Sequence, residues 1–299
     1  MGGDAILALD DVRATGVTPN AALRNPYDSH PVVIFLHIGK TAGSTLRQIL
    51  KRQFPPGDVM TVRAHRRPRE ETLAEFARLS EAERLRPRLI MGHTVFGLHE
   101  SVPRESTYIT MLRNPVRLAH SQYRYVLRTP THRHFEAASG MSLEQYVESG
   151  MAMEMDNSQT RALSGDLDVP YGACTDEMLA RAKRHLDDHF SWVGLTERFD
   201  ESILLLGHAF GWRDVRYVSV KVARQRAELA PGDRALLERR NALDIDLYEH
   251  ARAIVERRIA DADGFAAELE AFQRANARYR WSGRITHTWP AALRRRVAR

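Results

Sequence analysis

The 299-residue sequence has few of the features that mark secreted or membrane proteins. Its only cysteine is Cys174, which excludes an internal disulfide and any Cys-based zinc site and fits a reducing compartment. No apolar run approaches the ~20 residues that span a bilayer. The N-terminal segment MGGDAILALDD has no basic region before its short apolar stretch, unlike a secretory signal. We therefore expect a cytoplasmic protein without a transmembrane segment.

Other absences narrow the function classes. The sequence has no internal repeat and no low-complexity stretch, so a repeat architecture is not expected. It has no basic motif interleaved with aromatic residues, so we expect no nucleic-acid partner. The net charge of +6 favours an anionic ligand. The hydrophobic content of 43% supports an ordinary core, and the sequence does not predict the oligomeric state.

The strongest local pattern is a buried strand that leads into a turn of small residues and then a helix. Residues 32–38 are nearly all apolar and mostly β-branched, which is typical of a strand covered on both faces. The turn that follows contains Lys40, Thr41, Gly43, Ser44 and Thr45. Backbone N–H groups at a helix N-terminus, together with a lysine and hydroxyls, bind anions. The pattern predicts a site for a nucleotide phosphate.

This turn departs from the nucleoside-triphosphate loop. That loop has a glycine five positions before its Gly-Lys pair, where this sequence has Ile34. We therefore expect the turn to hold a 5′-phosphate without enclosing a triphosphate. The alternative is an ordinary strand-to-helix turn with an exposed Lys40.

Strands alternate with helices along the chain. Further strands are predicted at residues 59–62, 88–91, 107–112 and 192–195, and helices at residues 70–85, 115–127, 143–148, 175–189 and 197–210. This alternation predicts an α/β fold with a central parallel β-sheet flanked by helices. We place the α/β domain at residues 31–260, after an irregular lead-in at 1–30 and before a C-terminal helix and basic tail at 261–299.

A second anion site is predicted where residues 107–112 end. In open parallel sheets the ligand lies beyond the carboxyl ends of the strands, and Arg113 stands at such an end. Its guanidinium can form a forked contact with a phosphate, and Ser121, two helical turns on, can donate to the same group. Two such sites suggest a nucleotide with 5′- and 3′-phosphates. The alternative is that Arg113 pairs with a carboxylate and Ser121 is an ordinary surface hydroxyl.

Five segments together resemble a known family. They are FLHIGKTAGSTL at 35–46, MGHTVFGLHE at 91–100, YITMLRNPVRLAHSQYRYV at 108–126, DNSQTRALSG at 156–165 and WVGLTERFDESILLL at 192–206. The chain resembles the carbohydrate sulfotransferases that use 3′-phosphoadenosine 5′-phosphosulfate (PAPS), most of all the heparan and uronyl 2-O-sulfotransferase-like branch with its bacterial members. The resemblance implies the P-loop-like sulfotransferase fold and PAPS as sulfo donor. The acceptor would be a glycan or another hydroxyl-bearing molecule.

The resemblance also implies roles for the two anion sites. The first turn would bind the 5′-phosphosulfate, and Arg113 with Ser121 would bind the 3′-phosphate. Two positions depart from the family pattern. Gly39 replaces the usual proline before the lysine, and Asn114 stands where aspartate is common. We expect neither to abolish the site.

Sulfo transfer to a hydroxyl needs a base, because the hydroxyl loses a proton as it attacks in line. Histidine suits this task. His93 follows a predicted strand and so lies at the carboxyl ends of the strands, where the ligand is expected. The Gly92-His93 pair also matches the catalytic Gly-His segment of the resembled enzymes. His99 is the rival, and His37 is either an assisting residue or a packed strand-end histidine. Lys40 would stabilise charge on the bridging oxygen.

The remaining expectations are less specific. Asn157, Gln159 and Arg161 could face a sugar, or Asp156 or Asn157 could simply cap a helix. Thr196 could touch the nucleotide. The basic run at 63–69 could bind an anionic polymer or be a solvated loop, and the arginines of residues 293–299 could contact a membrane surface. No metal is required, because a sulfo group carries less charge than a phosphoryl group. The alternative functions are a P-loop-type kinase and a non-catalytic nucleotide-binding protein.

Overall fold

The structure, a computed structural model, contains the predicted parallel sheet. It describes residues 31–63, 69–94, 96–219 and 229–288. The five strands are β1 (Val32–Leu36), β2 (Val59–Arg63), β3 (Leu89–His93), β4 (Ser106–Leu112) and β5 (Phe190–Leu195). They lie in the order β2-β3-β1-β4-β5, and every neighbouring pair is parallel. The five predicted strands and the α/β class are confirmed.

The central position of β1 explains why its sequence is apolar throughout. All five of its residues are buried, because β3 and β4 pair with its two edges and side chains of the core cover both faces. Its last residue, Leu36, is opposite Gly92 of β3 and Thr110 of β4. The segments that leave the carboxyl ends of these three strands therefore begin side by side.

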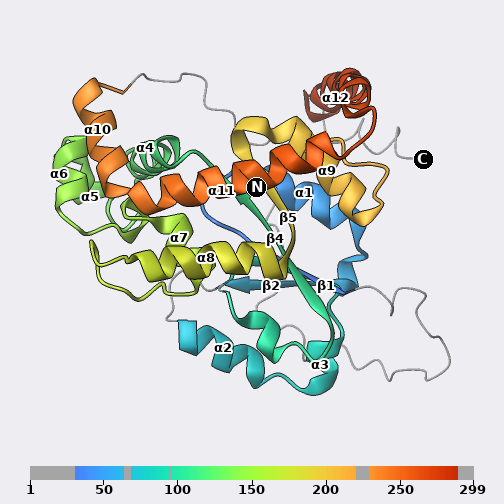
Figure 1. The fold of residues 1–299 in the computed structure, drawn as a ribbon, viewed down its shortest axis with the longest axis horizontal. Helices are drawn as coiled ribbons and strands as arrows, with labels where there is room; N and C mark the ends of the chain where they lie inside the picture. The colour runs from blue at the N-terminus through green and yellow to red at the C-terminus, as the bar shows by residue number, and fades with distance from the viewer. Residues whose placement is uncertain (1–30, 64–68, 95, 220–228, 289–299) are drawn as a thin grey trace.

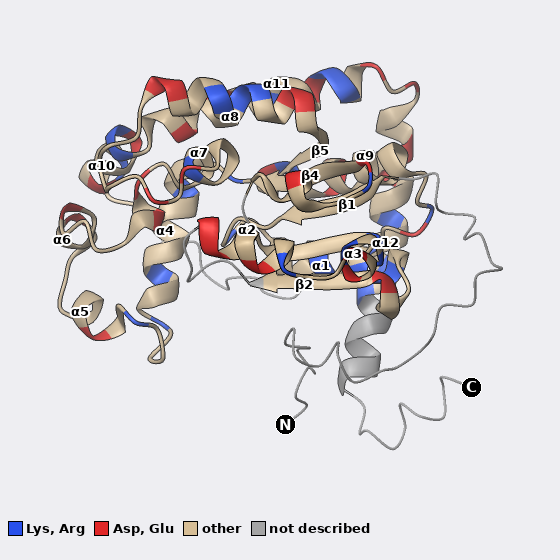
Figure 2. Cartoon of the chain, turned by 90° about the horizontal axis from the view of Figure 1, so that it is seen from below, with Lys and Arg blue, Asp and Glu red and all other residues tan. Residues whose placement is uncertain are grey.

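Twelve α-helices lie in the described ranges. They are α1 (Gly43–Gln53), α2 (Arg69–Ala77), α3 (Glu81–Leu85), α4 (Pro115–Val126), α5 (Phe135–Ser139), α6 (Leu143–Glu148), α7 (Ser158–Ser164), α8 (Asp176–His189), α9 (Phe199–Phe210), α10 (Pro231–Arg240), α11 (Ala242–Ala260) and α12 (Phe265–Thr288). Helices α8 and α11 lie side by side along the β5 side of the sheet (Figures 1 and 2). The connection from β4 to β5 carries five helices, α4 to α8. Of these, α4 follows directly on β4, and α7 contacts Arg113 through Gln159.

The single helix predicted at residues 70–85 is wrong, because the chain forms two. A capping box starts α3: the Ser80 hydroxyl accepts from the backbone N–H of Glu83, and the Glu83 carboxylate accepts from the backbone N–H of Ser80 at 2.8 Å. This reciprocal pair satisfies two helix-end donors and favours a helix start at this point. The Ser-x-x-Glu signal was present in the sequence.

A second hydrophobic cluster holds α4 in place. Buried side chains from α4, α5, α6 and α10 meet there, including Val126, Ala138, Val147 and Leu237. Figure 1 shows these four helices gathered at one end of the molecule. Because α4 follows directly on the carboxyl end of β4, this cluster fixes the helix that carries Ser121.

The predicted termini lie mostly outside the described part of the chain. Residues 1–30 and 289–299 are not described, so the lead-in and the basic tail stay predictions. The helix predicted in the C-terminal region is α12, and its Phe265 is buried in the main core. Within the described ranges, no helix is long and apolar enough to cross a membrane.

Candidate active site

Two residues of the turn between β1 and α1 have left-handed backbones, which residues other than glycine seldom adopt. Lys40 has φ 65° and Ala42 has φ 61°, whereas Thr41 between them does not have a positive φ. Alternation of this kind turns successive backbone N–H groups toward one side and creates an anion-binding concavity. The turn has the backbone geometry that its sequence predicts for a phosphate site.

The first residues of α1 add to this site. Ala42 is the N-cap and offers no side chain to the first N–H groups of the helix, which leaves backbone donors for an anion. Ser44 is partly buried, and Thr45 is buried. The Thr41 hydroxyl donates to the carbonyl of Ile38 at 2.8 Å and so closes the turn, and the predicted contact of Thr41 with the nucleotide stays a prediction.

The left-handed backbone at Ala42 predicts a stabilising substitution. Such a conformation costs a residue with a Cβ about 1–2 kcal/mol, whereas glycine adopts it freely but loses more entropy on folding. We expect Ala42→Gly to raise the free energy of unfolding by about 0.5–1 kcal/mol in urea titrations. The control, Ala182→Gly in the interior of α8, should lower it by at least about 1 kcal/mol. A loss of stability in Ala42→Gly would contradict the strained turn.

His37 lies directly behind this turn. Its ring stacks on Phe35 at 5.2 Å and on His93 at 4.4 Å between centroids. A Cβ on Gly43 would overlap the His37 ring, so glycine is needed where the helix passes it. Burial, followed by the charges of His93 and Arg47, lowers the pKa of His37 to about 3. His37 is therefore neutral near pH 7 and adds no positive charge beside His93.

His93 is the last residue of β3 and lies at the carboxyl end of the strand, as predicted. Its Nδ1 lies 3.1 Å from the carbonyl oxygen of His37. A carbonyl can only accept, so Nδ1 carries the proton and Nε2 is the basic nitrogen of the neutral ring. Gly92 has φ 142°, and a Cβ there would overlap the carbonyl of Val62 in β2. The Gly-His pair is thus explained by a strand end that only glycine can form.

Arg113 follows the carboxyl end of β4 and reaches the turn after β1. Its Nη1 donates to the carbonyl oxygen of Lys40 at 2.9 Å, and its Nε lies 4.0 Å from a carboxylate oxygen of Glu197. Glu197 also accepts from the backbone N–H of Asn114 at 3.1 Å. The alternative, in which Arg113 pairs with a carboxylate, is therefore partly met by Glu197. The same guanidinium also contacts the turn between β1 and α1.

Lys40 also contacts α4, the helix that carries Ser121, through Tyr125. The Lys40 Nζ lies 4.3 Å from the centre of the Tyr125 ring, in a cation–π contact. Ser121 precedes Tyr125 by four residues on α4, so both side chains share one face of the helix. Lys40 therefore contacts both Arg113 and the face of α4 that carries Ser121, and the predicted role of Ser121 stays a prediction. The contact of Lys40 with Tyr125 was not predicted, although the i+4 spacing of Tyr125 from Ser121 indicated that both side chains share one face of the helix.

His99, the rival base, lies elsewhere. Its Nδ1 is 3.1 Å from the hydroxyl of Tyr108, in the amino-terminal half of β4, and its ring is 4.9 Å from that of His189. His189 is the last residue of α8 and directly precedes the amino end of β5. Because the strands are parallel, this places His99 toward the end of the sheet opposite His93.

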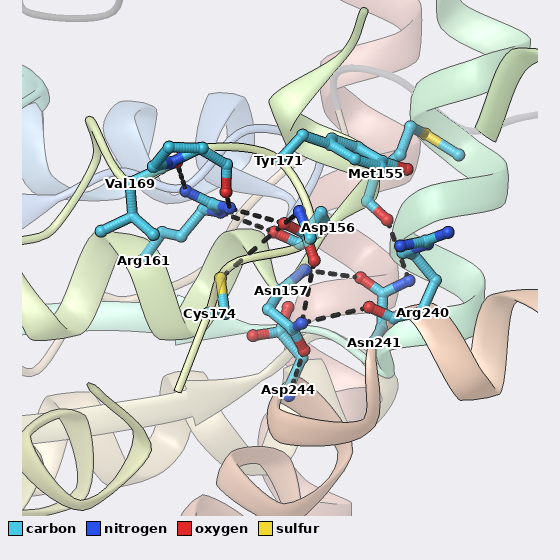
Figure 3. Close-up of polar contacts among 12 residues, drawn as sticks. Met155, Asp156, Asn157, Arg161, Val169, Tyr171, Cys174, Arg240, Asn241 and Asp244 are labelled. Carbon is cyan, nitrogen blue, oxygen red and sulfur yellow. Dashed lines mark hydrogen bonds and ion pairs between the residues drawn. The ribbon is translucent and has the colours of Figure 1, made fainter. Parts of the chain in front are cut away.

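Asn157 and Arg161 are held inside the fold, contrary to the expectation that they face a sugar. Arg161 is 2% exposed, and its Nη2 pairs with the Asp156 carboxylate at 2.5 Å. Asn157, 7% exposed, donates to the Asp156 carboxylate and to the backbone carbonyl of Arg240. Figure 3 shows these side chains turned toward one another between α7 and α11. They hold the loop around α7 together. Asn157 occupies the N-cap position of α7, as in the alternative, but its side chain makes no capping hydrogen bond.

Thr196 also has an internal contact. Its hydroxyl donates to the carbonyl oxygen of Leu112 at 2.9 Å, which ties the ends of β4 and β5 together. Its predicted contact with the nucleotide stays a prediction, as does polymer binding by the basic run at 63–69, since residues 64–68 are not described. Among the described residues, no group of three or more His, Cys, Asp or Glu side chains could hold a metal ion.

Comparison with known proteins identifies the family. The sequence profile of the Galactose-3-O-sulfotransferase family matches residues 5–287. Galactose-3-O-sulfotransferase 3 of Bos taurus is 31% identical over 275 residues, covering 85% of this chain and 64% of that protein. Galactosylceramide sulfotransferase of Bos taurus is 28% identical over 266 residues, covering 83% of this chain and 63% of that protein. The chain thus spans less than two thirds of the length of these relatives.

A solved structure, a sulfotransferase from Alicyclobacillus acidocaldarius, aligns with a TM-score of 0.43 and 16% identity over 76% of this chain and 96% of that one. The heparan and uronyl 2-O branch and a bacterial origin, both suggested by the motifs, are not shown by these comparisons. The profile match covers nearly the whole chain, and the chain therefore belongs to the galactose-3-O-sulfotransferase family.

Proposed function

We propose that this chain transfers a sulfo group from PAPS to a hydroxyl of a carbohydrate, with galactose as the acceptor sugar. The observation that carries the proposal is the bond from Arg113 Nη1 to the carbonyl oxygen of Lys40 at 2.9 Å. It joins two cationic sites at the ends of β4 and β1, which matches a nucleotide with phosphates at two positions. Family membership supports sulfo transfer over the kinase alternative.

The residues at these strand ends fit such a donor by their chemistry. The concave turn and the first N–H groups of α1 bind the 5′-phosphosulfate together with Lys40. Arg113 and Ser121 bind the 3′-phosphate, because a guanidinium and a hydroxyl are both donors for phosphate oxygens. When bound, the donor supplies the sulfo group and a phosphate as leaving group.

His93 removes the proton of the acceptor hydroxyl in this proposal. Its Nδ1–H is fixed on the His37 carbonyl, so Nε2 is the ring nitrogen whose electron pair can accept a proton. The stacked, neutral ring of His37 holds the imidazole plane of His93 without adding charge. Lys40 stabilises the negative charge that develops on the bridging oxygen as the sulfur–oxygen bond to the phosphate breaks.

Galactose is proposed as acceptor because the names of the relatives contain it. The name Galactose-3-O-sulfotransferase 3 contains galactose, and the name galactosylceramide sulfotransferase contains a galactosyl lipid. The first name also points to the 3-hydroxyl. The uronyl 2-hydroxyl suggested by the sequence motifs is the competing acceptor.

The proposal is tested by incubating the protein with a panel of acceptors and PAPS whose sulfo group is labelled. We expect a β-galactoside to be labelled, its 3-O-methyl derivative to remain unlabelled, and a desulfated heparan chain to remain unlabelled. Labelling of the heparan chain alone would transfer the proposal to the uronyl branch. Transfer of phosphate from ATP, with no sulfate transfer to any acceptor, would overturn it in favour of the kinase alternative.

A further inference from the structure

The side chain of Gln159 forms two hydrogen bonds with the backbone of Arg113. Its Oε1 accepts from the backbone N–H of Arg113 at 2.9 Å, and its Nε2 donates to the Arg113 carbonyl at 2.9 Å. Only this orientation of the amide satisfies both contacts. Gln159 is fully buried in α7, so this pair is shielded from water.

This contact lies just beyond the last residue of β4 that pairs with a neighbouring strand. The last pairing of β4 joins Leu112 with Leu195, and Arg113 lies one residue beyond it. Gln159 takes the place of a neighbouring strand by engaging both the N–H and the carbonyl of Arg113. The direction of the Arg113 side chain, which leaves this backbone toward the Lys40 carbonyl, therefore depends on Gln159.

Gln159 is itself fixed by a buried carboxylate from another helix. Asp244 of α11 is fully buried and accepts from the backbone N–H groups of Gln159 at 3.0 Å and Thr160 at 2.7 Å. In return, the backbone N–H of Asp244 donates to Oδ1 of Asn157 at 3.1 Å. The N–H groups of Gln159 and Thr160 are N-terminal donors of α7, so the Asp244 carboxylate from α11 caps that helix.

The contacts form one continuous path. Asp244 fixes the start of α7, α7 presents Gln159, Gln159 holds the backbone of Arg113, and Arg113 bonds to the anion-binding turn at Lys40. We propose that Gln159 is a positioning residue, locked by Asp244, that holds Arg113 in the orientation needed to grip the 3′-phosphate of the donor. This inference rests on the proposed function, which assigns the 3′-phosphate to Arg113.

Nucleotide discrimination tests the inference. The affinities for adenosine 3′,5′-bisphosphate and for adenosine 5′-monophosphate are measured by isothermal titration, and their ratio reports the 3′-phosphate contact alone. Displacement of a binding group by about 1 Å can weaken its effect about 10²-fold. We expect Gln159→Leu to lower the ratio by about 10- to 10²-fold and to leave the affinity for the monophosphate near parental.

A matched variant separates positioning from general loosening of α7. Leu163 lies one turn after Gln159, is fully buried in the main core, and has an apolar side chain. Leu163→Ala should lower the melting temperature while keeping the parental ratio. Equal loss of the ratio in both variants would overturn the inference, and so would a parental ratio in Gln159→Leu.

Two further results complete the test. If Gln159→Leu does not fold, Gln159→Glu decides, because it keeps the size and the acceptor for the Arg113 N–H but loses the donor to the Arg113 carbonyl. A lowered ratio in Gln159→Glu supports the inference, and a parental ratio overturns it. If the parent chain itself shows no preference for the bisphosphate, the proposed function has failed, and the inference that rests on it fails with it.

Discussion

Replacement of His93 by alanine is expected to lower kcat by about 10²–10⁴-fold, the usual contribution of a general base. Affinity for adenosine 3′,5′-bisphosphate should stay near parental, since the proposed donor contacts come from the turn at Lys40 and from Arg113. Steady-state kinetics with labelled donor and a titration of the bisphosphate measure the two effects separately. In the proposed mechanism, His93 has a catalytic role without a binding role. Lys40 has both, so its replacement by alanine should lower both kcat and the affinity for the bisphosphate.

Two further variants sharpen this prediction. His93→Asn keeps a donor that can reach the His37 carbonyl but has no basic nitrogen, so it should be as slow as the alanine variant. Free imidazole should restore part of the activity of His93→Ala by replacing the lost base. His99→Ala, which changes a residue toward the opposite end of the sheet, should retain kcat. Full activity in His93→Asn would show that the base is another group.

The strand pattern was predictable because the strands are short and largely apolar runs inside a parallel sheet. Strand β1 is the clearest case: it is paired on both edges and covered on both faces, so its residues have no polar side to obscure the signal. The rule that ligands lie beyond the carboxyl ends of parallel strands then located His93 and Arg113 from sequence alone. Both residues lie where this rule put them.

The contacts of α7 could not be predicted in the same way. Asn157, Gln159 and Arg161 are polar residues in a segment that follows a predicted helix, and such residues usually face solvent or ligand. Their partners include Asp244 and Asn241, more than 80 positions away along the chain. No local periodicity reports such long-range pairing, so a buried polar network and a binding surface have the same sequence signature. Only the packing of α11 against α7 distinguishes them.

Arg113→Ala is expected to abolish the preference for adenosine 3′,5′-bisphosphate over the 5′-monophosphate, lowering the bisphosphate affinity by about 10²-fold. The reason is the loss of a forked guanidinium contact, in which each hydrogen bond to a charged group contributes about 1.5–3 kcal/mol. Monophosphate affinity should change far less, because the turn between β1 and α1 is retained. Isothermal titration of both nucleotides measures the difference directly.

Two variants show whether the preference for the bisphosphate depends on the two-point guanidinium contact or only on a positive charge. Arg113→Lys keeps the charge but cannot form the planar, two-point contact, so it should recover only part of the preference. Arg117→Ala removes an equal charge from an exposed position in the first turn of α4 and should leave the preference intact. If Arg113→Ala kept the parental preference, or if Arg117→Ala lost it equally, the preference would not come from a dedicated contact at Arg113. The 3′-phosphate would then have to bind elsewhere at the carboxyl ends of the strands. The hypothesis of one phosphate site at Lys40 and a second at Arg113 would be wrong.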